Sequence, residues 1–321
     1  MMKRFAFALL PALALVAAAP ALAATAPATK SAGNAPAMTA ADLNAFYAGL
    51  VPYALHRADI PGAVIVVVKD GKILFAEGYG YADVKTKRPV DPATTIFRPG
   101  SVSKLFTWTA VMQLVQAGKI DLDADVNKYI DFTIPPFEGK PVTMRDLMTH
   151  TGGFEETVRD LLVERADQVL PIDVYLKRRL PTRIFPPGKI IAYSNYGATL
   201  AGYIVQRVSG ERFEDYIAKH ILDPLQMRYS TFEQPLPPRL APLAATGYLD
   251  ASQGKTKPFE FVDTAPAGAS SSTGIDMAHF MLAYLDGGTY DGYQLLEPAT
   301  IKEMWTPQVA PEPGLPSFDL G

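Results

Sequence analysis

The sequence predicts an α+β fold in which an antiparallel sheet carries a large, all-helical insertion. Residues 63–81 have the pattern of a β-hairpin, and helical patterns dominate from about residue 101 to about residue 240. The last residues, 316–321, look like the approach to another strand. Since an isolated two-stranded hairpin is only marginally stable, we expect residues beyond Gly321 to complete the sheet.

The composition fits one large globular unit with ample material for a core. The chain has 321 residues, of which 48% are hydrophobic and 20% are charged, and its formal net charge is −3. This balance does not favour nucleic acid or an anionic membrane as a partner. The absence of cysteine excludes disulfides and thiol chemistry. The four histidines are scattered and no His-Glu-x-x-His motif occurs, so we expect no metal site.

Residues 1–23 have the pattern of a secretory signal peptide. Lys3 and Arg4 precede an apolar run that ends in Ala21-Leu22-Ala23, a small-residue cleavage pattern. An uncleaved membrane anchor is the alternative, but prolines and many alanines weaken the run as a spanning helix. Residues 24–38 are predicted to be a flexible linker and residues 39–321 the folded domain. We therefore expect export to the periplasm or secretion.

The domain is predicted to begin with a helix and the hairpin. Thr39 starts a capping-box pattern, and an amphipathic helix follows it. The stretch from Ala63 to Val68 is rich in β-branched residues, Asp70-Gly71 is a favoured two-residue turn, and Ile73 to Tyr81 returns. This pattern predicts an antiparallel pair with one buried face.

A polar connection from Lys85 to Thr95 leads to the most apolar helix of the chain. The turn residues Arg98-Pro99-Gly100 run into an apolar pattern that begins at Ser101 and stops at Gly118, which indicates a buried helix. Further helices are predicted at 122–129, 143–148, 158–164, 172–180, 196–208 and 213–225, and from about 277 to 285 after the small-residue stretch 266–273.

Ser101 and Lys104 lie three residues apart where this buried helix begins. Residues at this spacing share a helix face, so the Lys104 amine comes within reach of the Ser101 hydroxyl. A serine becomes a nucleophile when a base takes its proton, and a lysine is a base only where a dry setting lowers its pKa. The alternative is a serine N-cap followed by a lysine that reaches solvent. Ser252 and Lys255 have the same spacing, but they lie in a polar stretch without helical periodicity.

A second polar group, Tyr193-Ser194-Asn195, precedes the helix predicted at 196–208. Taken alone, Tyr193 is interpreted as a buried tyrosine with a satisfied hydroxyl, and Asn195 as a helix N-cap. His150 follows the helix predicted at 143–148 and precedes Gly152-Gly153, so we interpret it as part of the loop architecture near the pocket.

Three motifs together resemble the serine β-lactamase and penicillin-binding protein superfamily. They are Ser101-Val102-Ser103-Lys104, the stretch from Met144 to Gly153, and Tyr193-Ser194-Asn195, in the order and spacing of that superfamily. The resemblance is closest to class C β-lactamases and to β-lactamase-related esterases and D-amino-acid peptidases, and it covers about Ala41 to Met304. It implies an α+β fold of the α/β sandwich type, with helices flanking the antiparallel sheet.

The resemblance also implies a function and a role for each site residue. It makes Ser101 the acylated nucleophile, Lys104 and Tyr193 together its base or proton shuttle, and Asn195 a holder of Lys104 and the substrate carbonyl. The implied protein is an exported serine hydrolase that acts on an ester, a β-lactam or a D-amino-acid peptide without a cofactor. The alternative is a non-catalytic penicillin-recognising or membrane-signalling ectodomain that is acylated without turnover.

One family element is missing from the sequence. Relatives carry a Lys-Thr-Gly or His-x-Gly strand that lines the pocket and supplies an oxyanion donor. Lys85-Thr86-Lys87 and Lys255-Thr256-Lys257 lack the glycine, and neither is predicted to be a strand. We expect that element beyond Gly321, and we therefore expect residues 1–321 alone to hydrolyse little, since losing one oxyanion donor costs about a hundredfold.

Overall fold

The computed structural model describes residues 37–159, 161–310 and 319–320. The predicted signal peptide and nearly all of the predicted linker lie outside these residues. Within the described ranges, no helix is long and apolar enough to cross a membrane.

Helices make up most of the regular structure. In chain order they are α1 (Ala40–Arg57), α2 (Lys104–Gln116), α3 (Met144–Met148), α4 (Ile172–Arg178), α5 (Asn195–Ser209), α6 (Phe213–Ile217), α7 (Ala265–Gly268), α8 (Gly274–Leu285) and α9 (Pro298–Met304). Shorter helical turns are η1 (Gly100–Ser103), η2 (Val126–Lys128), η3 (Ala166–Gln168), η4 (Ala218–Leu222) and η5 (Ala241–Leu243). The strands are β1 (Gly62–Lys69), β2 (Lys72–Asp83), β3 (Arg88–Pro89), β4 (Leu162–Val163), β5 (Gly247–Asp250), β6 (Lys255–Lys257), β7 (Phe261–Val262), β8 (Thr289–Tyr290) and β9 (Tyr293–Gln294).

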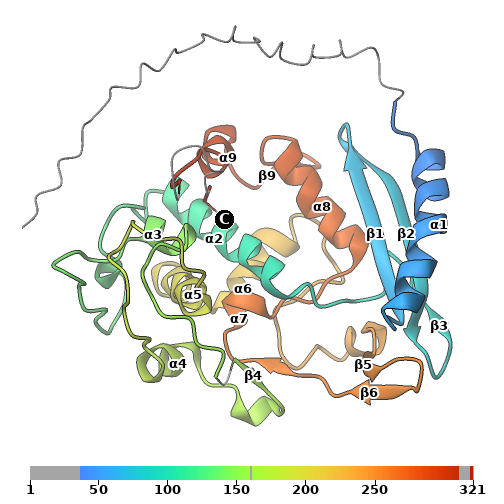
Figure 1. Cartoon of the computed structure of the whole chain (residues 1–321). Helices are drawn as coiled ribbons and strands as arrows, with labels where there is room; N and C mark the ends of the chain where they lie inside the picture. Colours follow the sequence, from blue (N-terminus) through green and yellow to red (C-terminus); the bar gives the residue numbers. More distant parts are fainter. Residues whose placement is uncertain (1–36, 160, 311–318, 321) are drawn as a thin grey trace, which may run out of the picture. The chain divides into compact units, whose positions relative to one another are not determined.

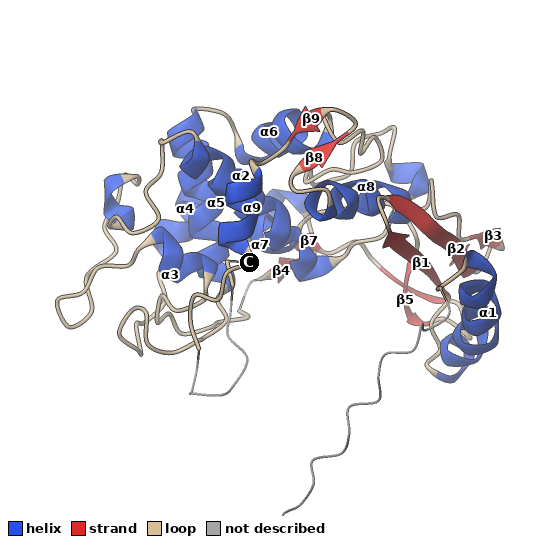
Figure 2. Cartoon of the chain, turned by 90° about the horizontal axis from the view of Figure 1, so that it is seen from above, coloured by secondary structure: helices blue, strands red, loops and turns tan. Residues whose placement is uncertain are grey.

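The predicted hairpin is confirmed and forms the largest sheet of the described residues. β1 pairs antiparallel with β2, and β3 adds to the far edge of β2. Asp70 and Gly71 both have positive φ, at 52° and 72°, which suits the turn of a tight hairpin. α1 packs against β2 and α8 against β1, so helices flank the sheet (Figures 1 and 2). The predicted fold class is confirmed.

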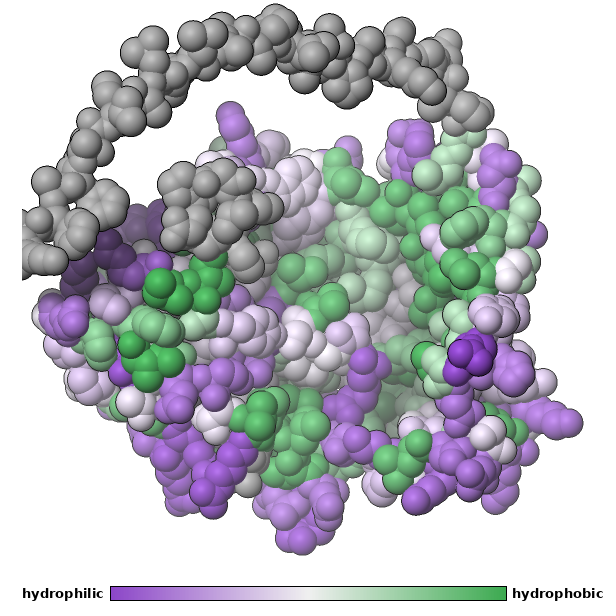
Figure 3. Space-filling model, viewed as in Figure 1, coloured by the Kyte–Doolittle hydropathy of each residue, from purple (hydrophilic) through white to green (hydrophobic). Residues whose placement is uncertain are grey.

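Apolar side chains gather where the hairpin faces α8. Figure 3 shows hydrophobic residues over the hairpin, and a hollow of about 220 Å³ between β1 and α8 is lined by Val64, Val66 and Met277 among others. A separate small cluster of Val51, Phe75 and Tyr79 joins α1 to the other face of the hairpin. Both faces of the sheet therefore contact apolar partners.

The main core lies in the helical block around α2. Most of α2 is buried, as the sequence predicts, and it packs against α5, α6 and α7. Its apolar side chains, such as Trp108 and Met112, join one large cluster with residues of α3, α5 and α6. This helix carries Lys104 at its first position, so the core fixes the base of the candidate site.

Three local predictions are wrong. The described residues of 158–164 form no helix, because Leu162–Val163 pairs with Phe261–Val262 as β4 and β7. Lys255–Lys257 is strand β6, paired with β5, where the sequence predicts no strand. Of 122–129, only Val126–Lys128 is helical, as one short turn capped by the Asp125 side chain.

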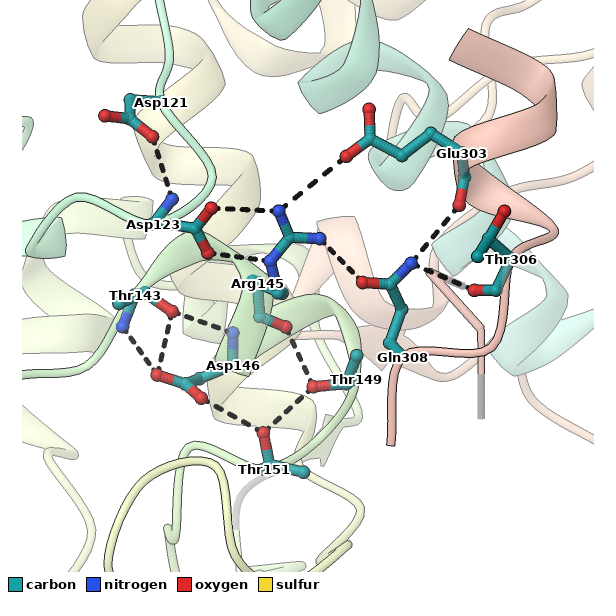
Figure 4. A network of polar contacts seen from close by, with 10 residues as sticks. All are labelled: Asp121, Asp123, Thr143, Arg145, Asp146, Thr149, Thr151, Glu303, Thr306 and Gln308. Atoms are coloured by element: carbon teal, nitrogen blue, oxygen red, sulfur yellow. Dashed lines mark hydrogen bonds and ion pairs between the residues drawn. The ribbon is translucent and has the colours of Figure 1, made fainter. Parts of the chain in front are cut away.

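A polar network ties α3 to α9 and the residues that directly follow it (Figure 4). The Arg145 guanidinium donates to both carboxylate oxygens of Asp123, at 2.7 and 2.9 Å, and to Gln308 Oε1 at 2.6 Å. At the start of the same helix, Thr143 and Asp146 form a capping box. The network fixes α3, and the loop that follows α3 carries His150 and Glu156.

Candidate active site

Ser101 lies on a tight helical turn that projects it to the surface. It belongs to η1, immediately before α2, and its side chain is exposed while Ser103 and Lys104 are buried. The Ser103 hydroxyl lies 2.7 Å from Ser270 Oγ and accepts a hydrogen bond from the Ser270 N–H at 3.0 Å. These contacts hold the turn against the segment after α7. The backbone that carries Ser101 is therefore anchored, while its exposed hydroxyl is accessible to a substrate.

Lys104 contacts Ser101 as the spacing predicts. Its Nζ lies 3.2 Å from Ser101 Oγ, and it also donates to Asn195 Oδ1 at 2.8 Å and to the Ala267 carbonyl at 2.9 Å. The residue is 4% exposed. Burial lowers the pKa of Lys104 to about 8, and the charge of Glu156 opposes this by raising it. A substantial fraction of the amine is therefore neutral near pH 8.

Asn195 is the first residue of α5, and its side chain points to Lys104. The prediction that Asn195 caps this helix is wrong, because Ser194 is the N-cap and its Oγ accepts from the Gly197 N–H at 3.0 Å. Capping by Ser194 leaves the Asn195 amide free to bind Lys104 through Oδ1.

Tyr193 lies beside Lys104 but presents its ring. The Lys104 Nζ is 4.6 Å from the ring centroid, a cation–π distance, and 45% of Tyr193 is exposed. It is thus not the buried tyrosine of the simpler interpretation. Among the described residues, its hydroxyl has no hydrogen-bond partner, so it is free to meet a substrate.

Two residues without a predicted catalytic role complete this cluster. His150, which the sequence places only in the nearby loop, is buried; its ring centroid lies 4.5 Å from that of Tyr193, and its Nδ1 accepts from the Ser194 N–H at 3.2 Å. Glu156 accepts from the Asn195 N–H and from Asn195 Nδ2, both at 2.8 Å. The sequence offers only one signal for Glu156, a carboxylate close behind His150 and the Gly152-Gly153 pair.

Ser101 opens into a hollow of about 300 Å³. Its walls include Asn195, Leu162, Val262 and Ala267, so the pairing of β4 with β7 forms one side. A larger cavity of about 690 Å³ lies between the loop before Ser101 and the β5–β6 hairpin and shares Arg98 and Glu260 with the hollow. We place the chemistry in the smaller hollow because Ser101 lines it.

The arrangement suits acyl transfer. It joins an exposed hydroxyl, a buried amine with a lowered pKa, an amide and a phenol, and these are the groups that a covalent mechanism uses. Ser252 and Lys255 do not share this setting, because both are exposed. Within the described ranges, no group of three or more His, Asp or Glu side chains is placed to hold a metal ion.

Comparison with known sequences agrees with the resemblance drawn from the motifs. Residues 48–321 match the beta-lactamase family. The protein named flp of Staphylococcus aureus (strain MW2) is 32% identical over 189 residues, which are 58% of this chain and 37% of that protein. The chain thus spans little more than a third of the length of this curated relative.

Two solved structures have a similar fold. The octameric penicillin-binding protein homologue from Pyrococcus abyssi has a TM-score of 0.72 at 27% identity, over 88% of this chain and 64% of that chain. A class C beta-lactamase has a TM-score of 0.72 at 22% identity, over 89% of this chain and 75% of that chain. The predicted resemblance is confirmed by these matches.

Proposed function

Because the chain belongs to the beta-lactamase family, we propose that it is a serine hydrolase that forms an acyl-enzyme at Ser101. The observation that carries the proposal is the contact between the Ser101 hydroxyl and the buried Lys104 amine at 3.2 Å. The substrate class that we propose is a carboxylic ester, a β-lactam or a D-amino-acid peptide, and an ester or cell-wall-like peptide is favoured over a dedicated β-lactam role.

The three partners of Lys104 support a direction for proton transfer. A charged amine donates to Ser101, Asn195 and Ala267, but a neutral amine has two hydrogens and one lone pair. The Ala267 carbonyl and Asn195 Oδ1 are acceptors only, whereas a hydroxyl also donates. When Lys104 loses a proton, its lone pair therefore turns to Ser101, which becomes the donor to it.

The proposed reaction has two halves. In the first, Lys104 takes the proton of Ser101 as Oγ attacks the carbonyl, and the proton passes to the leaving group through Lys104 or Tyr193 as the ester or amide bond breaks. In the second, the same pair takes a proton from water as it attacks the acyl-enzyme, and returns a proton to Ser101 Oγ. The Tyr193 hydroxyl is suited to the transfer because it is exposed and free within the described residues.

The test is the intact mass of the full-length protein after treatment with a fluorophosphonate or a labelled penicillin. We expect one adduct per chain in the parent and none in Ser101→Ala. Ser252→Ala is the matched control, since Ser252 has the same spacing to a lysine, and it should label like the parent. An adduct that persists in Ser101→Ala, or a folded parent that reacts with neither reagent, would overturn the proposal.

The fluorophosphonate adduct is permanent in any serine hydrolase, so the lifetime of the penicillin adduct is the one to follow. Recovery of the unmodified mass within minutes after penicillin labelling indicates hydrolysis, whereas a permanent penicillin adduct together with no Ser101-dependent ester hydrolysis favours a non-catalytic receptor that is acylated once. We also propose that the protein is exported through residues 1–23. The mass of the protein recovered from the periplasm tests this, because cleavage after Ala23 leaves a chain that starts at Ala24.

A further inference from the structure

The carboxylate of Glu156 accepts two hydrogen bonds from Asn195, the first residue of α5. Oε2 accepts from the backbone N–H of Asn195, and Oε1 accepts from the side-chain Nδ2, both at 2.8 Å. Hydrogen bonds to a charged acceptor are about twice as strong as neutral ones. The backbone N–H belongs to the first turn of α5, where it has no partner within the helix and where a negative charge is favoured.

These hydrogen bonds allow the side-chain amide of Asn195 only one orientation. Its Oδ1 faces the Lys104 Nζ at 2.8 Å, and its Nδ2 faces the carboxylate of Glu156. A rotation of the amide by 180° would place Oδ1 against a carboxylate and the NH₂ group against an ammonium, so both contacts would become repulsive. The orientation of Asn195 is therefore set by the charges on its two sides.

We propose that Glu156 is a positioning residue of the acylation site, which fixes the Asn195 amide and through it the Lys104 amine beside Ser101. The inference rests on the proposed function. Glu156 is exposed and lies on the loop between α3 and α4, so it is not part of the core that holds α2 and α5 together. Among the described residues, its two hydrogen bonds are both with Asn195, which suggests a role at the site and not in global stability.

The charge of Glu156 also acts on Lys104. Burial lowers the pKa of that amine, and Glu156 raises it. The other titratable groups next to Lys104 are Tyr193, whose ring it faces, and His150, whose pKa is lowered by burial and by the Lys104 charge. α7 contributes only the carbonyl of Ala267. Removal of the Glu156 charge is therefore expected to lower the pKa of Lys104.

The chain offers a matched control one residue away. Glu155 is also exposed, has the same charge and lies on the same loop, but none of the contacts above involves its side chain. Its backbone N–H donates to the Thr182 carbonyl at 2.8 Å, and substitution of the side chain leaves that bond in place. Glu155→Gln and Glu156→Gln thus make the same change in net charge at neighbouring positions.

The experiment measures kcat/KM for p-nitrophenyl acetate from pH 5.5 to 10 in the full-length parent, Glu155→Gln, Glu156→Gln and Glu156→Asp. Rates are normalised to the fraction of protein that a fluorophosphonate labels, which corrects for any misfolded protein. In the parent, the rate should rise with pH to a plateau, with a midpoint near the pKa of Lys104, about 8.

We expect Glu156→Gln to lower the plateau about tenfold, since its amide can accept only one of the two N–H groups. We also expect its midpoint to move about half a unit to lower pH, because the raising charge is gone. Glu156→Asp should restore the midpoint even where its shorter side chain leaves the plateau low. Glu155→Gln should match the parent in both.

Each outcome bears on a different claim. If Glu156→Gln and Glu155→Gln have the same plateau and midpoint, the positioning role is wrong. If the plateau falls in Glu156→Gln but the midpoint stays, Glu156 supports the loop and does not act on Lys104, which also overturns the inference. If the parent shows no Ser101-dependent rate, the proposed function fails before the role of Glu156 is reached.

Discussion

His150 is held in a single protonation state by its surroundings. Its Nδ1 accepts from the Ser194 N–H at 3.2 Å, so a proton on Nδ1 would meet another donor. Burial, with the Lys104 charge second, lowers the pKa of His150 to about 4. Its φ of 56° is a conformation that asparagine also adopts without much strain. The neutral ring holds the segment before α5 through its contacts with Tyr193 and Ser194.

His150 is therefore predicted to link stability to pH. A group whose pKa is depressed by folding adds stability above its unfolded pKa, about 6.5, and that stability is lost as the pH falls towards the folded pKa, about 4. We expect the unfolding free energy of the parent to fall by about 2 kcal/mol between pH 7.5 and pH 4.5 through this residue alone. In His150→Asn, the unfolding free energy should fall by about 2 kcal/mol less over the same pH range. Urea unfolding at the two pH values measures the difference.

The control is His56→Asn, since His56 is an exposed histidine near the end of α1. It should keep the pH-dependent loss of stability that His150 causes in the parent. Equal pH dependence in the parent and in His150→Asn would show that His150 is not held neutral by the fold. The comparison is between the changes in unfolding free energy with pH in the two proteins. The stability lost with the hydrogen bond to Ser194 is the same at both pH values and cancels.

At the scale of elements, the approach of α5 to α7 depends on Gly202. A Cβ at this position would lie 2.4 Å from Cγ and 2.5 Å from Cβ of Pro266, inside any allowed contact. Pro266 belongs to α7 and precedes Ala267, whose carbonyl accepts from Lys104. The absence of a side chain at Gly202 therefore lets Pro266, and the Ala267 carbonyl next to it, lie this close to α5.

We predict that Gly202→Ala destabilises the protein by about 1–3 kcal/mol, although alanine is the better helix former. The clash outweighs the propensity because a rigid proline ring on a buried helix has little room to move. The same substitution should lower kcat in the ester assay, since the Ala267 carbonyl shifts. Gly49→Ala in α1, where a Cβ would meet nothing within 4 Å, should be neutral or stabilising. Equal stability of the two variants would contradict this account of the α5–α7 contact.

The elements also show why sequence predicted some features and missed others. The hairpin is a local pattern, because its turn and both strands lie within one short segment. The strand at Leu162–Val163 is not local, because its partner Phe261–Val262 lies about a hundred residues along the chain. Its apolar residues also fit a helical pattern, and only the pairing with the distant partner makes this segment a strand.

The candidate site divides in the same way. Ser101 and Lys104 are three residues apart, and helix geometry alone predicts their contact. Asn195 is 91 residues from Lys104, and only the family resemblance pointed to it. Glu156 lies on an exposed loop without periodicity, and its role follows from two contacts with a residue 39 positions away. No pattern within the loop itself predicts that meeting.

At the scale of the whole domain, the buried apolar side chains of the described residues divide into two clusters of unequal size. The larger surrounds α2 and α5 and contains fully buried residues such as Phe154, Leu200 and Ile204. The smaller consists of Val51, Phe75 and Tyr79 between α1 and the hairpin. Because local stability follows the amount of buried apolar contact, the layer of α1 and the hairpin is expected to open more easily than the helical block.

Hydrogen exchange followed by mass spectrometry tests this expectation. In the parent, amides of β1 and β2 should exchange at lower opening free energies than amides of α5.

Phe75→Ala removes the centre of the small cluster and should raise exchange in α1, β1 and β2 while α5 keeps its protection. Phe154→Ala, the matched loss from the large cluster, should cost about 3–5 kcal/mol and raise exchange in both layers, since the hairpin does not survive without the block. If Phe75→Ala raises exchange in α5 as much as in β2, the domain opens as one cooperative unit. In the expected case, the candidate site stays ordered when the hairpin opens, because α2, α5 and α7, which carry Lys104, Asn195 and Ala267, all belong to the more stable block.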